Sequence, residues 1–376
     1  MIKDGFLKVL LASALILGLG LLGLILIVDP YRVSPIAPDI RHVNHFKPRS
    51  DNIDRQAKPL NVLWKQPRTV FMGTSRVHWG LNPADLDGTR FAPAYNAAAP
   101  ATWLGENVAD LGLYARLDPN LKAVFVELRF SQFLAPWTDR HPRTIADLVK
   151  GSQSLFVSLR ALLDSARTLA YNLRVDTPCA EVRPEGWFHQ ASGQDPVPNF
   201  RGFPQGMWDA WNRSGRKLPY APSALEAVHA IIDFARAHDL ELVFLLLPEH
   251  VYFDYFIDTL DLWPMMETWL PEISGAAAVV SFTRLNAITR EEGDAVRGHW
   301  SDPNHFTPEV GRMVLKALAG TPLPETPPDF MEHLTPESAR RLIALRRTAI
   351  RRWRADHPAF DAAVKAEFEK HGATFP

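Results

Sequence analysis

Two short segments near opposite ends of the chain contain residue types that could together carry out acyl transfer. The first, Val70-Phe-Met-Gly-Thr-Ser-Arg76, is an apolar run that stops at a turn of small residues and exposes Ser75, the candidate nucleophile. Serine is a weak nucleophile on its own and needs a neighbouring base, which in turn needs an acid to orient it. In the second segment, Asp302 and His305 are three residues apart in a turn that contains proline, so both side chains can address one point.

The elements that must position these residues are predicted from short apolar runs that alternate with helical patterns. Gly73 permits a tight turn, and a serine after it sits outside the carboxyl end of a strand, where open α/β sheets bind ligands. Because apolar strands separated by helices form parallel sheets covered on both faces, the sequence predicts a three-layer, doubly wound α/β domain. The expected strands cover residues 68–73, 91–96, 123–128, 241–247 and 278–282, and the expected helices cover residues 101–116, 223–238 and 308–318.

The two segments resemble the blocks of the SGNH (GDSL-type) hydrolase superfamily, whose first block carries a serine and whose last block is Asp-x-x-His. By that resemblance Ser75 is the nucleophile, His305 is the general base and Asp302 is its partner. The resemblance also implies a flavodoxin-like order of the parallel strands. It covers roughly residues 65–130 and 240–320.

Further segments narrow the resemblance to one branch of that superfamily. An apolar N-terminal run followed by Asp29-Pro-Tyr31, together with Tyr95-Asn-Ala-Ala-Ala99, resembles membrane-anchored proteins that acetylate alginate or cellulose, or that help add D-alanine to teichoic acids. This implies an extracytoplasmic O-acyltransferase that modifies a polysaccharide through an acyl-serine, with a membrane-bound O-acyltransferase as acyl supplier. It also implies a single-pass protein of the bacterial inner membrane with its catalytic domain in the periplasm.

The N-terminal run predicts a membrane anchor. Residues 9–28 carry no charge and form a helix about 30 Å long, which matches the hydrocarbon core of a bilayer. A cleaved signal peptide is the alternative, but its apolar region is typically only about 7 to 15 residues, and no Ala-x-Ala site follows. The expected organisation is an anchor at 1–29, a juxtamembrane arm without periodicity at 30–67, a catalytic domain at 68–322 with an insertion or lid at 137–220, and a linker with a basic helix at 323–376.

The donors that would stabilise an oxyanion are less clearly marked. The Ser75 amide and the Asn96-Ala97-Ala98 turn are expected to supply them, although Asn96 could instead cap a turn. The Gly-x-Asn-Asp block of the superfamily is missing, since the third strand ends in Val126-Glu-Leu-Arg129. Arg76 could bind an anionic substrate group or pair with Glu127. Two other histidines near the predicted site are a rival base, His78, and a cleft residue of unknown role, His250.

Composition excludes several other classes of protein. The formal charge of −1 gives no reason to expect nucleic acid binding, and the apolar fraction of 47% supports a full core. The single cysteine, Cys179, rules out an internal disulfide. No phosphate loop, dinucleotide fingerprint or metal-ligand spacing is present, so neither a cofactor nor a metal is expected.

Two segments each allow two interpretations, and the candidate site is compatible with three functions. A loop at 177–219 holds aromatic residues that could stack on sugar rings or form a small core, namely Trp187, Phe188, Phe200, Phe203, Trp208 and Trp211. Seven arginines at 340–354 could contact lipid headgroups or an acidic polymer, or could lie on a solvated helix docked on the domain. The site fits an O-acyltransferase, an esterase that uses water as acceptor, or a non-catalytic scaffold of an acylation complex.

Overall fold

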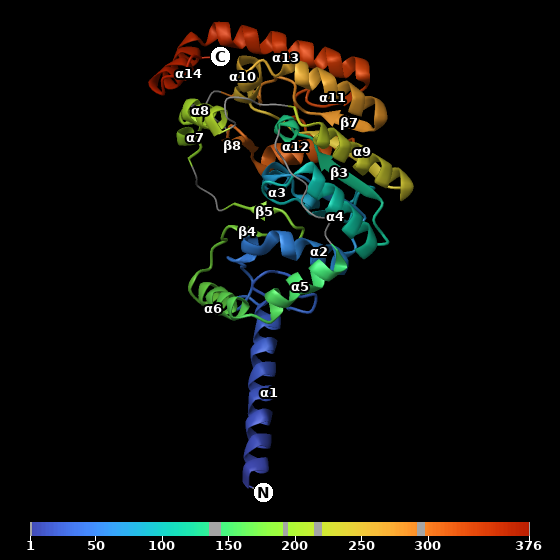
Figure 1. Cartoon of the computed structure of the whole chain (residues 1–376), viewed down its shortest axis with the longest axis vertical. Coiled ribbons are helices and arrows are strands. Elements are labelled where there is room, and N and C mark those ends of the chain that lie inside the picture. Colours follow the sequence, from blue (N-terminus) through green and yellow to red (C-terminus); the bar gives the residue numbers. More distant parts are fainter. Residues whose placement is uncertain (1, 135–143, 191–194, 214–219, 292–297, 376) are drawn as a thin grey trace.

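The structure is a computed structural model that describes residues 2–134, 144–190, 195–213, 220–291 and 298–375. Within these residues, the protein is a mixed α/β domain carried on one long apolar helix, α1 (Ile2–Val28), that projects from its lower end (Figure 1). From Gly5 to Val28 this helix is long and apolar enough to cross a membrane, and little of it is buried by the domain.

A six-stranded sheet forms the centre of the domain, in the order β10-β7-β6-β3-β1-β2. The strands are β1 (Thr69–Met72), β2 (Ala94–Asn96), β3 (Ala123–Glu127), β6 (Glu241–Leu246), β7 (Ala278–Ser281) and β10 (Glu332–Leu334). The first five are mutually parallel, and each lies inside a range predicted from the sequence. β10 pairs antiparallel with β7 and was not expected in what we predicted to be a linker. Every residue of β1 and β3 is buried, as expected for strands covered on both faces.

The sheet order reverses beside the strand that carries the candidate nucleophile. The chain passes from β1 to β2 on one side and then returns to β3 on the other side of β1. In open α/β sheets, ligands bind outside the carboxyl ends of the strands at such a reversal point. The turn at residues 73–75 follows β1, so the fold places Ser75 at this position.

The predicted helices are present, and others cover the rest of the sheet. α4 (Leu104–Leu117), α9 (Pro222–Ala237) and α12 (Pro308–Leu318) correspond to the three predicted helices. Two helices, α10 (Val251–Thr259) and α11 (Trp263–Ala276), were not predicted, and α11 places Trp263 and Trp269 in the main core.

The juxtamembrane arm is more ordered than predicted. It contains α2 (Asp54–Lys65), which packs against α4 and against α5 (Ile145–Phe156). The description of 30–67 as an arm without periodicity is therefore wrong for its second half. Apolar residues of α2 such as Leu60 lie in a small core shared with Ile25 of α1 and Leu155 of α5. This contact joins the arm to the insertion and to the end of α1.

The insertion at 137–220 divides into two parts. α5 and α6 (Leu159–Arg174) lie at the lower end of the domain beside α1, so this half does not form a lid over Ser75 (Figure 1). The second half contains β4 (Glu181–Val182), β5 (Phe188–His189), α7 (Val197–Arg201) and α8 (Phe203–Arg213). β5 contacts α3 (Ser75–Gly80), the helix that begins with the serine, and so approaches the candidate site. The parts of the insertion at 137–143, 191–194 and 214–219 lie outside the described residues.

The basic C-terminal helix is docked on the domain. α13 (Pro336–Asp356) packs on α10 and α11 and continues into α14 (Pro358–Lys370), at the end of the molecule opposite α1 (Figure 1). Arg346 is buried and pairs with Asp254 and Glu249, and Arg354 pairs with Asp258 at 3.0 Å. This arrangement supports the docked alternative, since the helix packs on the domain at the end opposite α1.

Candidate active site

The structure brings together the three residues predicted to form a catalytic triad. Ser75 Oγ lies 2.8 Å from His305 Nε2, and His305 Nδ1 lies 2.7 Å from Asp302 Oδ2. The serine and the histidine are 230 positions apart in the sequence. The contact between them therefore depends on the fold and not on local spacing.

The carboxylate of Asp302 is held in its charged form. Burial alone would raise its pKa, but hydrogen bonding to His305, the charge of that ring and the amides of Asn304 and His305 together hold the pKa of Asp302 below its usual value. Those amides donate to Asp302 Oδ1 at 2.7 and 3.0 Å. A charged Asp302 favours the tautomer with a proton on His305 Nδ1, which leaves the Nε2 lone pair facing the serine hydroxyl.

Ser75 is positioned by the turn between β1 and α3. Gly73 has φ of 156°, and a Cβ there would lie 2.7 Å from Glu127 Cβ, so the turn requires glycine. The next residue, Thr74, caps α3 and donates to Glu127 Oε2 from its amide (2.7 Å) and its hydroxyl (2.8 Å). As the first residue of α3, Ser75 has an amide with no acceptor among the described residues.

The histidine is positioned by a hairpin that packs on the serine helix. β8 (Trp300–Asp302) and β9 (His305–Phe306) form an antiparallel pair, and β9 contacts α3. A Cβ on Gly80 would overlap the Phe306 ring, so only glycine lets the two elements approach this closely. On the other side, the ring of Trp79 lies over His305 with 4.3 Å between centroids. These contacts hold the imidazole above Ser75.

The predicted oxyanion residue Asn96 is structural in this geometry. Its side chain is fully buried and donates to Val77 O (2.7 Å) and Leu81 O (2.8 Å), which uses both amide hydrogens. Its carbonyl oxygen accepts from the Ala98 amide at 3.1 Å, so that amide is engaged as well. Neither Asn96 nor Ala98 is free to donate to a substrate, and the turn-capping alternative is the one that fits.

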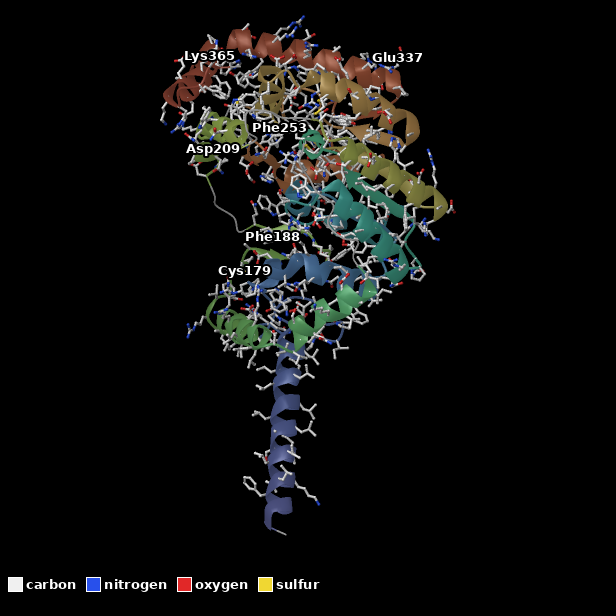
Figure 2. The ribbon with its side chains drawn as sticks, viewed as in Figure 1. Cys179, Phe188, Asp209, Phe253, Glu337 and Lys365 are labelled. Carbon is white, nitrogen blue, oxygen red and sulfur yellow. The ribbon has the colours of Figure 1, made fainter. Side chains whose placement is uncertain are left out.

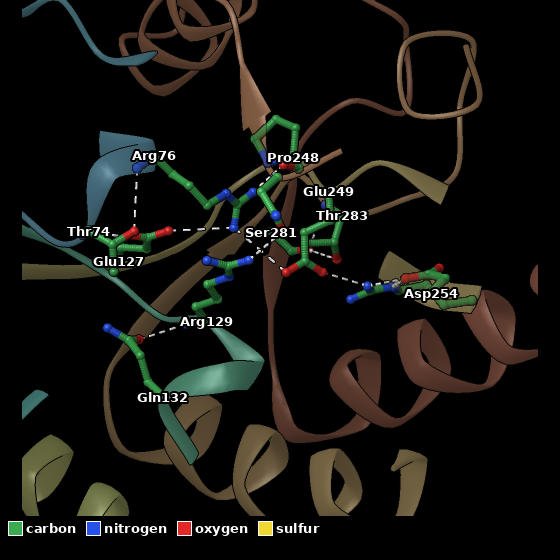
Figure 3. Close-up of polar contacts among 12 residues, drawn as sticks. Thr74, Arg76, Glu127, Arg129, Gln132, Pro248, Glu249, Asp254, Ser281 and Thr283 are labelled. Atoms are coloured by element: carbon green, nitrogen blue, oxygen red, sulfur yellow. Dashed lines mark hydrogen bonds and ion pairs between the residues drawn. The ribbon is translucent and has the colours of Figure 1, made fainter. Parts of the chain in front are cut away.

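Arg76 also belongs to the scaffold. Its side chain is buried, donates to Pro248 O, and faces Glu127 (3.5 Å) and Glu249 (3.7 Å). The pairing with Glu127 is the structural alternative expected from the sequence. The network extends from Thr74 through these acids to Asp254 (Figure 3). It connects the serine turn to the C-terminal helix through buried charges.

The two other histidines have polar partners other than Ser75. His78 is buried with Nε2 at 2.7 Å from Asp54 Oδ2. His250 is buried and caps α10; its ring contacts Glu291 O at 2.6 Å, and burial lowers its pKa to about 4. The rival base and the cleft histidine of the sequence analysis are therefore both structural.

The prediction missed Arg129. This residue follows β3 at the carboxyl edge of the sheet and donates from Nη2 to Asn304 Oδ1 at 2.8 Å, next to His305. Its backbone amide donates to Gln132 Oε1 at 2.9 Å, and no acceptor for Nε is present among the described residues. Burial, with the neighbouring Arg76, lowers the pKa of Arg129 to about 10, which still leaves it charged at neutral pH. The position of Arg129 just after the third strand, at the same edge of the sheet as Ser75, was the available signal.

Other chemistries find less support in the described part of the chain. No group of three or more His, Cys, Asp or Glu is placed there to hold a metal. Burial, followed by the charge of Glu181, raises the pKa of the Cys179 thiol to about 11, so it is not an activated nucleophile. Among the aromatic residues of the insertion, Phe200 and Trp208 are core residues, whereas the ring of Phe188 lies 6.3 Å from that of Trp79, which also contacts His305. Phe188 is the one best placed to border the site.

Comparisons with known proteins identified no similar protein. No family model, no curated protein and no solved structure matches the chain. What this site can do is therefore argued from its geometry.

Proposed function

We propose that the protein is a membrane-anchored serine O-acyltransferase, most simply an O-acetyltransferase, that modifies a cell-surface or secreted polysaccharide. The observation that carries the proposal is the continuous hydrogen-bonded chain from Ser75 through His305 to Asp302. A serine, a histidine and a carboxylate in this order can transfer an acyl group through a covalent intermediate. The chain lies at the carboxyl edge of the sheet, where the strand order reverses.

The reaction has two halves. Ser75 Oγ attacks the acyl carbonyl of the donor while His305 Nε2 takes the hydroxyl proton, and the charge of Asp302 stabilises the imidazolium. The Ser75 amide and the Arg129 guanidinium are available for the oxyanion. Collapse of the tetrahedral intermediate breaks the bond to the donor's leaving group, which receives the proton from His305. In the second half, an acceptor hydroxyl gives its proton to His305 and attacks the acyl-serine carbonyl. The bond to Ser75 Oγ then breaks, and His305 returns the proton to that oxygen, which leaves the acylated acceptor and free Ser75.

The order of the strands supports the proposal. The five parallel strands have the order β2-β1-β3-β6-β7, which is the order of a flavodoxin-like, doubly wound sheet. A three-layer domain of this type is consistent with an SGNH-like enzyme. The antiparallel β10 is an addition at the edge of that sheet.

The location and the partners of the protein follow from α1 and from the resemblance. The length, apolar composition and exposure of α1 support a single-pass anchor, with the catalytic domain on the periplasmic side of a bacterial inner membrane. A membrane-bound O-acyltransferase would deliver the acyl group, since the domain needs a donor on that side. The acceptor is the hydroxyl group of a polysaccharide.

An esterase is the second candidate. The side chains of His305 and Asp302 are 17% and 25% exposed, so water can reach an acyl-serine at this site. The same residues would then transfer the acyl group to water. The two functions differ only in which acceptor discharges the intermediate.

The test is the intact mass of the full chain in detergent micelles after brief exposure to an activated acetyl ester. Ser75→Ala and His305→Ala are measured in parallel. We expect one acetyl adduct on Ser75 that is absent in Ser75→Ala and is discharged faster by an oligosaccharide than by water. Discharge by water alone would favour the esterase. An adduct that forms equally in Ser75→Ala would overturn both functions.

A further inference from the structure

The helix α6 has its apolar side turned outward. Three of its leucines are exposed by 71% (Leu159), 47% (Leu163) and 65% (Leu173). At 3.6 residues per turn, these positions lie on one face of the helix, with Ala166 and Ala170 between them. A helix on the surface of a water-soluble domain shows polar residues on its outer face. The outer face of α6 is therefore suited to an apolar environment.

The opposite face of α6 is polar and buried. It consists of four residues that are each at most 3% exposed: Asp164, Ser165, Thr168 and Asn172. Tyr31 donates to Asp164 Oδ2 at 2.8 Å, and Asn172 exchanges two hydrogen bonds of 2.8 Å with the backbone of Phe46. These bonds anchor α6 to the segment that follows α1. The inverted orientation of the helix is therefore fixed by specific contacts.

α6 lies at the point where α1 enters the domain. It packs beside α1, and Ala161 shares a small core with Ile25 in the last turn of that helix (Figure 1). Figure 2 shows the side chains of α1 projecting outward below the domain, with Cys179 at this lower end and Glu337 at the other. If residues 9–28 span the hydrocarbon core of about 30 Å, Ile25 lies within about 5 Å of its edge. The exposed face of α6 is then at the level of the interface.

Arginines border the apolar face. Arg160, Arg167 and Arg174 follow one another at intervals of seven residues, on one side of the leucine stripe. The first two have side chains that are 60% and 57% exposed, although they also face Asp164 at 3.7 and 2.8 Å. An apolar stripe with cationic residues along its edge is the pattern of helices that lie in the interface of anionic membranes.

We propose that α6 lies in the headgroup interface of the bilayer that α1 crosses, with Leu159, Leu163 and Leu173 in contact with the acyl chains. The domain then touches the membrane at two places, which fixes its tilt and holds the Ser75 site at a constant height. The proposal rests on the anchoring of α1 but not on acyl-transfer chemistry. It replaces the lid expected for this half of the insertion.

The test uses spin labels on the full chain in vesicles of phosphatidylethanolamine and phosphatidylglycerol. Cysteine is introduced one position at a time into a Cys179→Ser background as Leu163→Cys, Leu173→Cys or Leu345→Cys. Leu345 on α13 is the matched control, because it is 45% exposed and lies at the far end of the domain. A fourth label at Ile16→Cys reports on α1. Each label is scored by its collision rate with oxygen, which enriches in lipid, and with a water-soluble nickel chelate.

We expect the ratio of oxygen to nickel collisions to be severalfold higher at positions 163 and 173 than at 345. A ratio at 163 equal to that at 345, with a lipid-exposed label at 16, overturns the proposal and leaves the face of α6 to an integral membrane protein. A water-exposed label at 16 would show that α1 does not span the bilayer and would overturn the proposal with it. The acetyl adduct on Ser75 tests the acyl-transfer chemistry independently.

The arginine border is tested with the double variant Arg160→Gln, Arg167→Gln. In the parent protein, the label at 163 should lie deeper in vesicles with phosphatidylglycerol than in pure phosphatidylcholine. The double variant should lose this dependence on anionic lipid while keeping its lipid exposure. An equal depth in both lipids for the parent protein would overturn the role given to the arginines.

Discussion

Thr74 and Glu127 are joined by two hydrogen bonds, from the threonine amide and hydroxyl to one carboxylate oxygen at 2.7 and 2.8 Å. The bonds connect the end of β1 to the end of β3, across the point where the order of the strands reverses. Glu127 also faces Arg76 at 3.5 Å and is fully buried. The turn that presents Ser75 is thus held by a buried charge on the neighbouring strand.

Glu127→Gln should therefore impair both stability and acylation. Loss of the carboxylate leaves Arg76 with one fewer acidic partner in the core, which should cost about 3 kcal/mol of unfolding free energy. A loosened Thr74 turn should slow acetylation of Ser75 at least about tenfold. Urea denaturation and the rate of adduct formation measure the two effects.

The control for this variant is Glu241→Gln. Glu241 pairs with Arg90 at 2.6 Å, but the two side chains are 40% and 66% exposed, so its loss should cost less than about 1 kcal/mol. Equal unfolding free energies for the two variants would contradict the prediction that the buried Glu127 pair contributes more to stability than the exposed Glu241 pair.

Asn96→Ala should destabilise the protein without a specific loss of catalysis. The substitution removes the side-chain donors to the buried carbonyls of Val77 and Leu81, and Val77 O keeps only the Leu81 amide, which should cost about 2 to 3 kcal/mol. Acetylation of the protein that remains folded should stay near the rate of the parent, because Asn96 has no spare donor for the oxyanion. Thermal melting and adduct formation well below the midpoint separate the two quantities.

Asn120→Ala is the control for Asn96, since its side chain is exposed and its loss should change stability by less than about 0.5 kcal/mol. If instead Asn96→Ala melted like the parent and lost acylation by orders of magnitude, Asn96 would have to be returned to the oxyanion site.

His250 should make the protein sensitive to mild acid. Burial lowers its pKa in the folded state to about 4, whereas an unfolded chain has a value near 6.5. Between these values the unfolded state binds more protons, so stability is complete above about pH 6.5 and falls as the pH drops toward 4. The loss attributable to this group is about 3 kcal/mol over that range.

His250→Asn tests this dependence, because asparagine can still cap α10 but does not titrate. The variant will be less stable at pH 7 through lost packing, yet its unfolding free energy should change less between pH 6.5 and 4 than that of the parent. His229→Gln removes an exposed histidine and should keep the parental dependence. Parallel pH profiles for the parent and His250→Asn would rule out the assignment.

The central sheet could be predicted because each of its parallel strands has a recognisable pattern in its own short segment of sequence. Runs such as Val70-Phe-Met72 are apolar throughout, and strands buried on both faces must be. The short spacing of Asp302 and His305 likewise predicted that their side chains would meet, as the 2.7 Å contact shows. Only the contact with Ser75 required the tertiary structure.

Other features could not be predicted, because their causes lie far away in the sequence. β10 is three residues, Glu332–Leu334, without an apolar run, and it forms a strand because β7 offers an open edge. The carbonyls that accept from the Asn96 side chain belong to residues 15 and 19 positions away. The leucines of α6 do follow helical spacing, but only the structure shows that they point outward.

Substitution of Arg129 can distinguish a residue that only supports the structure of the site from one that stabilises the oxyanion. Its guanidinium is fixed next to the His305 turn by Asn304 and lies over the Phe253 ring at 4.7 Å, while Nε keeps an unused hydrogen among the described residues. A fixed donor with a positive charge at the edge of a serine site is suited to a developing oxyanion. Arg129→Gln should therefore slow acetylation of Ser75 about 10²-fold, and Arg129→Lys, which keeps the charge but loses the planar fork, should slow it less.

The matched control for Arg129 is Arg312→Gln, which removes an exposed arginine whose nearest described acid is Asp85 at 3.7 Å. It should leave the rate unchanged. Because a destabilised scaffold would slow every substrate alike, the decisive comparison is the inhibition by a phosphonate that mimics the tetrahedral intermediate. Arg129→Gln should lose affinity for the reversible phosphonate complex in proportion to its loss of rate. A variant that bound the phosphonate as well as the parent does, while acetylating slowly, would place Arg129 in the scaffold with Arg76.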